Sequence, residues 1–148
     1  MFDQLLIGSF VTFTSLLLAS TLWWILTAFT ERWEAWLSAP PHFIKSTYMV
    51  GMVVLWSMMM MTVGVWLWAI ILRQMATFAT FEEAMYFALV AYTTLGIGDV
   101  PVPKEWRLLG GMVGANGFLM FGLMTAMLTD TLRHVRNAQF GKKVELPD

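Results

Sequence analysis

Three long apolar segments without a charged residue dominate this sequence and limit what it can fold into. They are residues 4–30, 47–72 and 108–129, and none of them contains Asp, Glu, Lys, Arg or His. A helix needs roughly 20 mostly apolar residues to cross the hydrocarbon core of a bilayer. Because that core offers the backbone no hydrogen-bond partner, the crossing segments must be helical. The pattern predicts an all-α membrane protein with three transmembrane helices.

A fourth apolar stretch, residues 84–98, is only 15 residues long and carries glycines and threonines near its end. It is too short to cross the membrane, so we interpret it as a re-entrant segment. Thr80 stands three residues before Glu83, which is the spacing of a capping box. We therefore expect a short helix from about Phe81 to residue 92 or 93. At about 1.5 Å per residue it reaches the middle of the bilayer without crossing it.

The composition excludes several functional classes. The sequence has no cysteine, so disulfides, iron–sulfur clusters and thiol chemistry are excluded. Its two histidines, His42 and His134, flank different apolar segments, and a zinc or di-iron site is not expected. A formal net charge of −1 provides no basic surface for nucleic acid. Because no nucleophile, base and orienting acid occur together, we do not expect an enzyme.

The positive residues indicate an orientation, because Lys and Arg concentrate near the cytoplasmic ends of spans. With the N-terminus outside, the cytoplasmic segments hold Arg32, Lys45, Arg133, Arg136, Lys142 and Lys143. The external segments then hold Arg73, Lys104 and Arg107. The opposite orientation reverses this ratio. We predict a multi-pass protein of the cell (inner) membrane with an external N-terminus, a cytoplasmic C-terminus and a re-entrant segment that enters from outside.

The residues that follow the re-entrant helix match a known signature. Thr93-Thr94-Leu95-Gly96-Ile97-Gly98-Asp99 resembles the Thr-Thr-x-Gly-x-Gly-Asp signature of the potassium-channel pore family. Phe121-Gly122-Leu123-Met124-Thr125-Ala126 is similar to the Phe-Gly-Leu-x-Thr-Ala stretch of prokaryotic members. The resemblance covers about residues 44–136 and implies a pore domain of outer helix, pore helix, filter and inner helix. Residues 1–43 then form an extra N-terminal transmembrane helix with an interfacial segment, and residues 137–148 form a short cytoplasmic tail.

The filter motif also has a physical reason. A dehydrated cation needs several oxygens in place of water, and backbone carbonyls supply them without a full charge that would trap the ion. Successive carbonyls face one axis only if the backbone alternates between conformations, which requires glycine at alternate positions, here Gly96 and Gly98. The resemblance implies K⁺ ligands from the carbonyls of Thr94, Leu95, Gly96 and Ile97 and from the Thr94 hydroxyl. It implies K⁺ ions with no cofactor, and a homotetramer, since one chain supplies one quarter of the ring.

The resemblance assigns supporting roles around the filter to Thr93, Asp99, Tyr86, Phe87 and Val90. Asp99 is expected at the outer mouth. Tyr86 and Phe87 stand where the family often carries paired tryptophans, and Val90 stands where some members carry a glutamate. Ile97 stands where an aromatic residue is most common. With fewer polar contacts around it, we expect a softer filter that still prefers K⁺ to Na⁺, by a smaller margin.

The inner helix is unusually rich in glycine, which favours close packing. Gly117 aligns with the hinge of the family's inner helix, where bending opens the pore. Residues that recur at helical spacing below it are expected to line the cavity and the lower pore, namely Phe118, Phe121, Thr125 and Thr129. We expect Asn116 to face the pore helix instead.

Several functions stay open on the sequence alone. A potassium-selective channel is the leading interpretation, and the alternatives are a weakly selective cation channel or a non-conducting membrane scaffold subunit. No span carries the regularly spaced arginines of a voltage sensor, and the tail is too short for a ligand-binding domain. Regulation by protons, lipid, tension or an unidentified protein is left open. We expect the first span to be a peripheral packing helix, with sensing or gating as the alternative.

Overall fold

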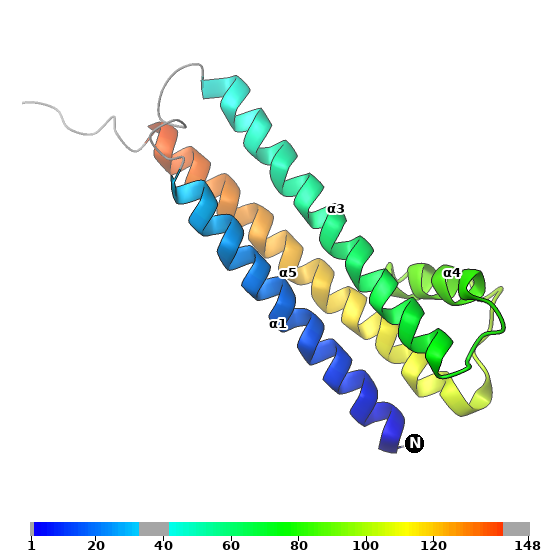
Figure 1. Ribbon diagram of the computed structural model, residues 1–148. Helices are drawn as coiled ribbons and strands as arrows, with labels where there is room; N and C mark the ends of the chain where they lie inside the picture. The colour runs from blue at the N-terminus through cyan, green and yellow to red at the C-terminus, as the bar shows by residue number, and fades with distance from the viewer. Residues whose placement is uncertain (1, 33–41, 141–148) are drawn as a thin grey trace, which may run out of the picture.

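The computed structural model describes residues 2–32 and 42–140 as a bundle of helices (Figure 1). Its elements are α1 (Phe2–Arg32), α3 (His42–Gln74), α4 (Phe81–Tyr92), the 3₁₀ turn η1 (Lys104–Trp106) and α5 (Arg107–Phe140). The interfacial segment predicted after the first span and most of the predicted tail lie outside the described residues.

Three of these helices are long and apolar enough to cross a membrane. The spans are Phe2–Ala28, Ile44–Gln74 and Lys104–His134, and each overlaps one predicted segment. The prediction of an all-α, multi-pass membrane protein with three long apolar helices is confirmed. The helices run further than the uncharged segments, because charged side chains near a helix end can extend to water. Helix α5 accordingly continues to Phe140.

Helix α5 is the central helix of the bundle (Figure 1). Helix α1 packs along it in the same direction, since Gln4 contacts Leu109 and Ser15 contacts Asn116. Helix α3 runs the other way, and the short α4 packs against both α3 and α5 at one end of the bundle. The fully buried side chains that fix this end are Trp68, Leu72, Tyr92, Leu109 and Val113. Because α1 runs parallel to α5, the N-terminus of α1 lies at the same end of the bundle as α4.

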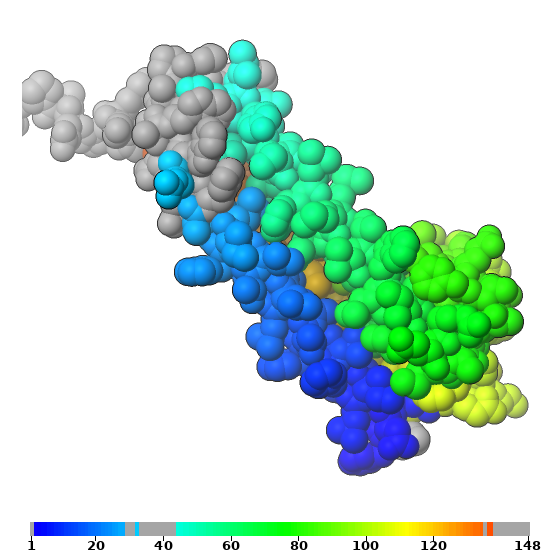
Figure 2. Space-filling view, viewed as in Figure 1, coloured from blue at the N-terminus to red at the C-terminus, as the bar shows by residue number. Residues whose placement is uncertain are grey.

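The outer faces of α1 and α3 are strongly apolar. Phe10 and Phe13 of α1 are 71% and 63% exposed, and Leu55 and Met58 of α3 are 66% and 61% exposed. Figure 2 shows α1 and α3 side by side over much of one face of the molecule, with only a small part of α5 visible between them. Such faces suit a lipid environment, where an exposed apolar side chain carries no hydration cost.

Candidate functional site

Helix α4 begins and ends where its local sequence dictates. The Thr80 hydroxyl accepts a hydrogen bond from the Glu83 backbone N–H at 3.2 Å, and the Glu83 carboxylate accepts one from the Thr80 N–H at 3.3 Å. This capping box starts the helix at the next residue, as predicted. At the other end the Thr93 hydroxyl donates to the Leu89 carbonyl at 2.8 Å, and the helix ends at Tyr92.

The backbone of residues 94–98 alternates in handedness. Thr94, Gly96 and Gly98 have φ angles of +60°, +59° and +81°, whereas Leu95 and Ile97 between them do not have positive φ. An L-residue with a side chain disfavours the left-handed region by roughly 1–2 kcal/mol, which explains glycine at two of the three positions. Thr94 adopts this conformation despite its branched side chain. The alternation expected for a row of carbonyls therefore begins at Thr94, two residues before the first glycine.

The N-terminal end of this segment is hydrogen-bonded to the C-terminal turn of α4. The N–H groups of Leu95 and Gly96 donate to the Val90 carbonyl at 3.0 and 3.2 Å, and the Thr94 N–H donates to the Ala91 carbonyl at 2.9 Å. The last carbonyls of a helix lack partners within the helix. These contacts therefore pair the terminal carbonyls of α4 with the N–H groups of the segment. The N–H groups of residues 94–96 consequently point toward the end of α4.

The same segment is open to its surroundings in the single chain. Every residue from 93 to 99 is exposed, including Leu95 at 67% and Ile97 at 58%. Apolar side chains with this much exposure at the end of a folded bundle mark a surface that another protein surface or lipid can cover.

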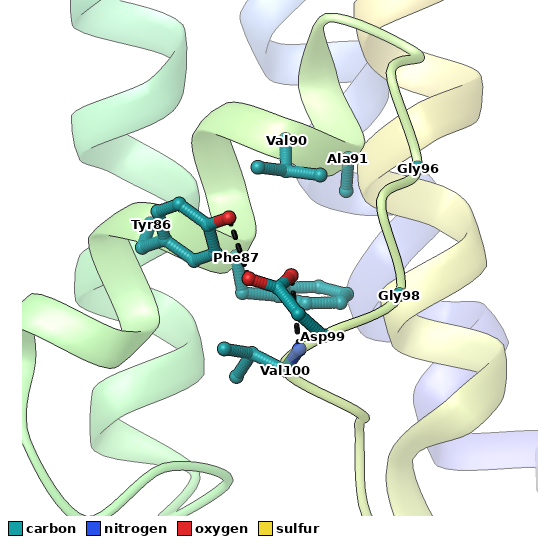
Figure 3. A pocket seen from close by; sticks show the side chains of 8 residues that line it. All are labelled: Tyr86, Phe87, Val90, Ala91, Gly96, Gly98, Asp99 and Val100. Atoms are coloured by element: carbon teal, nitrogen blue, oxygen red, sulfur yellow. Dashed lines mark hydrogen bonds between the residues drawn. The ribbon is translucent and has the colours of Figure 1, made fainter.

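A cavity of about 110 Å³ lies between α4 and the segment (Figure 3). Its walls are Tyr86, Phe87, Val90, Ala91, Gly96, Gly98, Asp99 and Val100. Of the residues assigned supporting roles, four therefore lie together behind the segment, and only Thr93 is absent from these walls.

Both carboxylate oxygens of Asp99 accept hydrogen bonds at one end of this cavity. The Tyr86 hydroxyl donates to Oδ2 at 2.7 Å, and the Val100 N–H donates to Oδ1 at 3.1 Å (Figure 3). The hydrogen bond to Asp99 is the main cause that raises the pKa of Tyr86 above its ordinary value of 10.0. Sequence reasoning expected fewer polar contacts here and missed this one. The available signal was the phenol of Tyr86 on the same helix face as Val90, four residues later.

Phe87 and Val90, the other two positions on α4 that differ from the residues often found in the family that the sequence resembles, have apolar side chains. The Phe87 ring packs against that of Phe78, with centroids 5.2 Å apart. Val90 is buried at 8% exposure and offers its carbonyl, not its side chain, to the segment. Tyr86 alone among these three positions thus supplies a polar side chain to the C-terminal end of the segment.

The residues predicted to line a pore share one exposed face of α5. Phe118 and Phe121 are 68% and 64% exposed, and Thr125 and Thr129 are exposed below them. The two threonine hydroxyls donate to carbonyls of their own helix, to Phe121 and Thr125 respectively, each at 2.9 Å. These hydroxyl oxygens remain able to accept hydrogen bonds from water on this face.

Gly117 lies directly on the end of α4. A Cβ atom built at this position would stand 1.8 Å from the Tyr92 carbonyl oxygen, far inside contact distance. Glycine is therefore required for the approach of α5, and α5 runs unbroken through it. The hinge role predicted for Gly117 stays a prediction. The neighbouring Asn116, expected at the pore helix, bonds to Ser15 of α1.

Comparison with known families identifies this region. A sequence model of the family described as “Ion channel” matches residues 58–134, which is more than half of the chain. The chain belongs to this ion-channel family. It is accordingly a channel-family protein and not a member of an enzyme family. No curated protein and no solved structure matches the chain significantly.

The ion-channel match begins within α3 and ends within α5, so it contains α4 and the alternating segment. The ion-channel region thus includes the cavity, the Tyr86–Asp99 bond and the contact of Gly117 with Tyr92. Helix α1 lies outside the match and packs against the channel region through α5.

Proposed function

We propose that this protein is a subunit of a homotetrameric potassium-selective channel and that residues 94–98 form its selectivity filter. The observation that carries the proposal is the alternation of φ at Thr94, Gly96 and Gly98. Together with N–H groups that bond to α4, it favours carbonyls directed to the opposite side, away from α4. A row of such carbonyls can replace the hydration shell of K⁺.

The proposed K⁺ ligands are the carbonyl oxygens of Thr94, Leu95, Gly96 and Ile97, with the Thr94 hydroxyl at the inner end. Gly98 permits the geometry without being a main ligand. Ions held by partial charges leave more readily than ions held by carboxylates, which suits rapid conduction. Passive flow of K⁺ through this row needs no cofactor.

Assembly into a tetramer follows from the ring that ligation requires. One chain supplies one strand of carbonyls, and the strand is exposed along its whole length in the single chain. Four copies around one axis would enclose the ion and cover Leu95 and Ile97. The exposed face of Phe118, Phe121, Thr125 and Thr129 would then line the cavity and the lower pore.

The proposed orientation has the N-terminus outside and the C-terminus in the cytoplasm. The charge bias supports it, and the fold is compatible because the N-terminus of α1 lies at the same end as α4. The filter mouth and the N-terminus would both face outward.

A weakly selective cation channel is the second candidate. It is favoured by the cavity of about 110 Å³ behind the filter and by Ile97, whose side chain donates no hydrogen bond. The bond between Tyr86 and Asp99 argues the other way, because it supports the outer end of the filter. On balance we propose that K⁺ is preferred.

The purified protein in a planar bilayer, with K⁺ on one side and Na⁺ on the other, tests these proposals together. A reversal potential near that of K⁺ is expected. A potential of zero would favour the weakly selective channel, and an absence of current from correctly assembled protein would favour a scaffold. The native mass in detergent should be four times the 16.8 kDa chain, and a dimer or monomer alone would contradict the ring.

A further inference from the structure

Helix α1, which is not part of the ion-channel match, is anchored to η1 and the first turns of α5. The Gln4 side chain accepts a hydrogen bond from the Leu109 N–H at 3.3 Å and donates another to the Glu105 carbonyl. One turn on, Gly8 lies so close to Met112 that a Cβ would stand 2.2 Å from the sulfur. These contacts fix the register of the two parallel helices.

A buried polar contact follows at the level of the filter's inner end. The Ser15 hydroxyl donates to Asn116 Oδ1 at 2.9 Å, and the two residues are only 5% and 0% exposed. A second acceptor for the same hydroxyl, the Thr12 carbonyl, also lies at 2.9 Å. Asn116 Nδ2 has no hydrogen-bond partner in the described part of the chain, so separation of α1 from α5 here would leave Oδ1 unpaired as well.

The contact stands next to Gly117, which rests on the backbone of Tyr92. Helix α1 then continues past this level without a break to Arg32. Its Ala19 is 1% exposed and belongs to the same apolar core as Met120 and Met124 of α5. Straight α1 thus packs on α5 both above and below Gly117, as the side-by-side course in Figure 1 shows.

Because α1 packs on α5 on both sides of Gly117, it would resist bending of α5 at that residue. From this arrangement we propose that α1 acts as a splint: it packs on α5 on both sides of Gly117 and opposes bending there. The Ser15–Asn116 hydrogen bond is the polar contact that holds the two helices together at this level. The splint stabilises the straight form of α5 and lowers the open probability of the pore. This inference rests on the proposed channel function and on bending of α5 as the opening movement.

The test compares single-channel open probability in planar bilayers for two serine variants of α1. Ser15→Ala removes the hydrogen bond to Asn116, and Ser20→Ala removes an exposed hydroxyl that donates to the Leu16 carbonyl of its own helix at 2.8 Å. Hydrogen bonds between membrane helices bias an equilibrium by about 3-fold on average and about 20-fold at most. Ser15→Ala should therefore raise open probability about 3- to 20-fold, whereas Ser20→Ala should leave it unchanged.

A swapped pair tests whether the bond itself is responsible. The double variant Ser15→Asn with Asn116→Ser keeps one hydroxyl and one amide at the contact and should return open probability toward that of the original chain. The K⁺/Na⁺ reversal potential should be the same in all variants, because the filter is not touched. That readout separates a change in gating from general damage to the pore.

The possible failures are distinct. Equal open probability in Ser15→Ala, Ser20→Ala and the original chain would overturn the splint and leave the channel proposal standing. A lower open probability in Ser15→Ala would also overturn it, since α1 would then favour the open form. If the original chain carries no current, the channel proposal fails and the splint fails with it.

Discussion

The hydroxyl of Tyr86 on α4 donates a 2.7 Å hydrogen bond to Asp99, thirteen residues later at the C-terminal end of the alternating segment. The bond ties the middle of the short helix to the point where the segment leaves the cavity (Figure 3). The N-terminal end of the segment is hydrogen-bonded to α4 separately, through the Val90 carbonyl. Both ends of the proposed filter are therefore attached to the same helix.

Tyr86→Phe should weaken the outer attachment while keeping the ring. Loss of one hydrogen bond to a carboxylate at an exposed position is expected to speed the decline of current at low K⁺ about threefold. The measurement is the decay rate of K⁺ current after a step to low K⁺ in planar bilayers. Tyr92→Phe is the matched control, because the buried Tyr92 hydroxyl has no hydrogen-bond partner in the described part of the chain. Equal decay in both variants would contradict the role of Tyr86.

The same bond predicts a response to alkaline solution on the filter side. The pKa of Tyr86 is raised above 10.0, so the phenol and its stabilising bond are fully present below pH 10. As the pH rises through the raised pKa, the phenolate forms, repels Asp99, and the contribution is lost. Current decay at low K⁺ should thus accelerate above about pH 10 in the original chain, with no such step in Tyr86→Phe. An identical alkaline step in the variant would assign it to another group.

Gly117→Ala should prevent normal packing. The added methyl would stand 1.8 Å from the Tyr92 carbonyl oxygen, which is backbone and cannot move aside as a flexible side chain can. We expect destabilisation of about 3 kcal/mol or more, seen as loss of the assembled protein in size-exclusion chromatography. Gly51→Ala on α3 is the control, since nothing lies within 4 Å of its added methyl. Assembly of Gly117→Ala at the level of the control would show that α5 can sit elsewhere.

Gly96→Ala separates conformational strain from crowding. No atom lies within 4 Å of the added methyl, yet the φ angle of +59° is unfavourable for alanine by roughly 1–2 kcal/mol. Assembly should survive while K⁺ current falls about tenfold, because the alternating backbone is less populated. Single-channel recordings on the assembled variant provide the measurement. Unchanged current would mean that alternation at this residue is not needed for conduction.

Local rules predicted much of the fold. Stretches without charge marked the three long helices, and the capping box of Thr80 and Glu83 gave the start of α4. Its end near Tyr92 followed from the glycines beyond it. These features depend on neighbours in sequence, so the sequence contains them directly. Glycine at 96 and 98 likewise indicated the alternating backbone. The left-handed conformation of Thr94 was not predicted, because no glycine stands there.

The missed features depend on contacts between distant residues. Tyr86 and Asp99 meet because the chain folds back along α4. No local sequence pattern predicts this contact. The face of α1 that meets α5 was equally hidden, because small and hydroxylated residues are spread around the whole helix. Asn116 was therefore assigned to the pore helix, when its partner is Ser15.

The left-handed conformation of Thr94 has a consequence for the effect of ion concentration. A branched residue at φ +60° favours any rearrangement that returns it to an ordinary conformation. In the proposed channel, an ion bound at Thr94 binds only the alternating form and so opposes that rearrangement by mass action. A penalty of roughly 1–2 kcal/mol corresponds to about a 5- to 30-fold change in the K⁺ concentration at which the two forms are equally populated. The permeating ion would then also be a structural ligand, and the chain would sense the supply of the ion that it conducts.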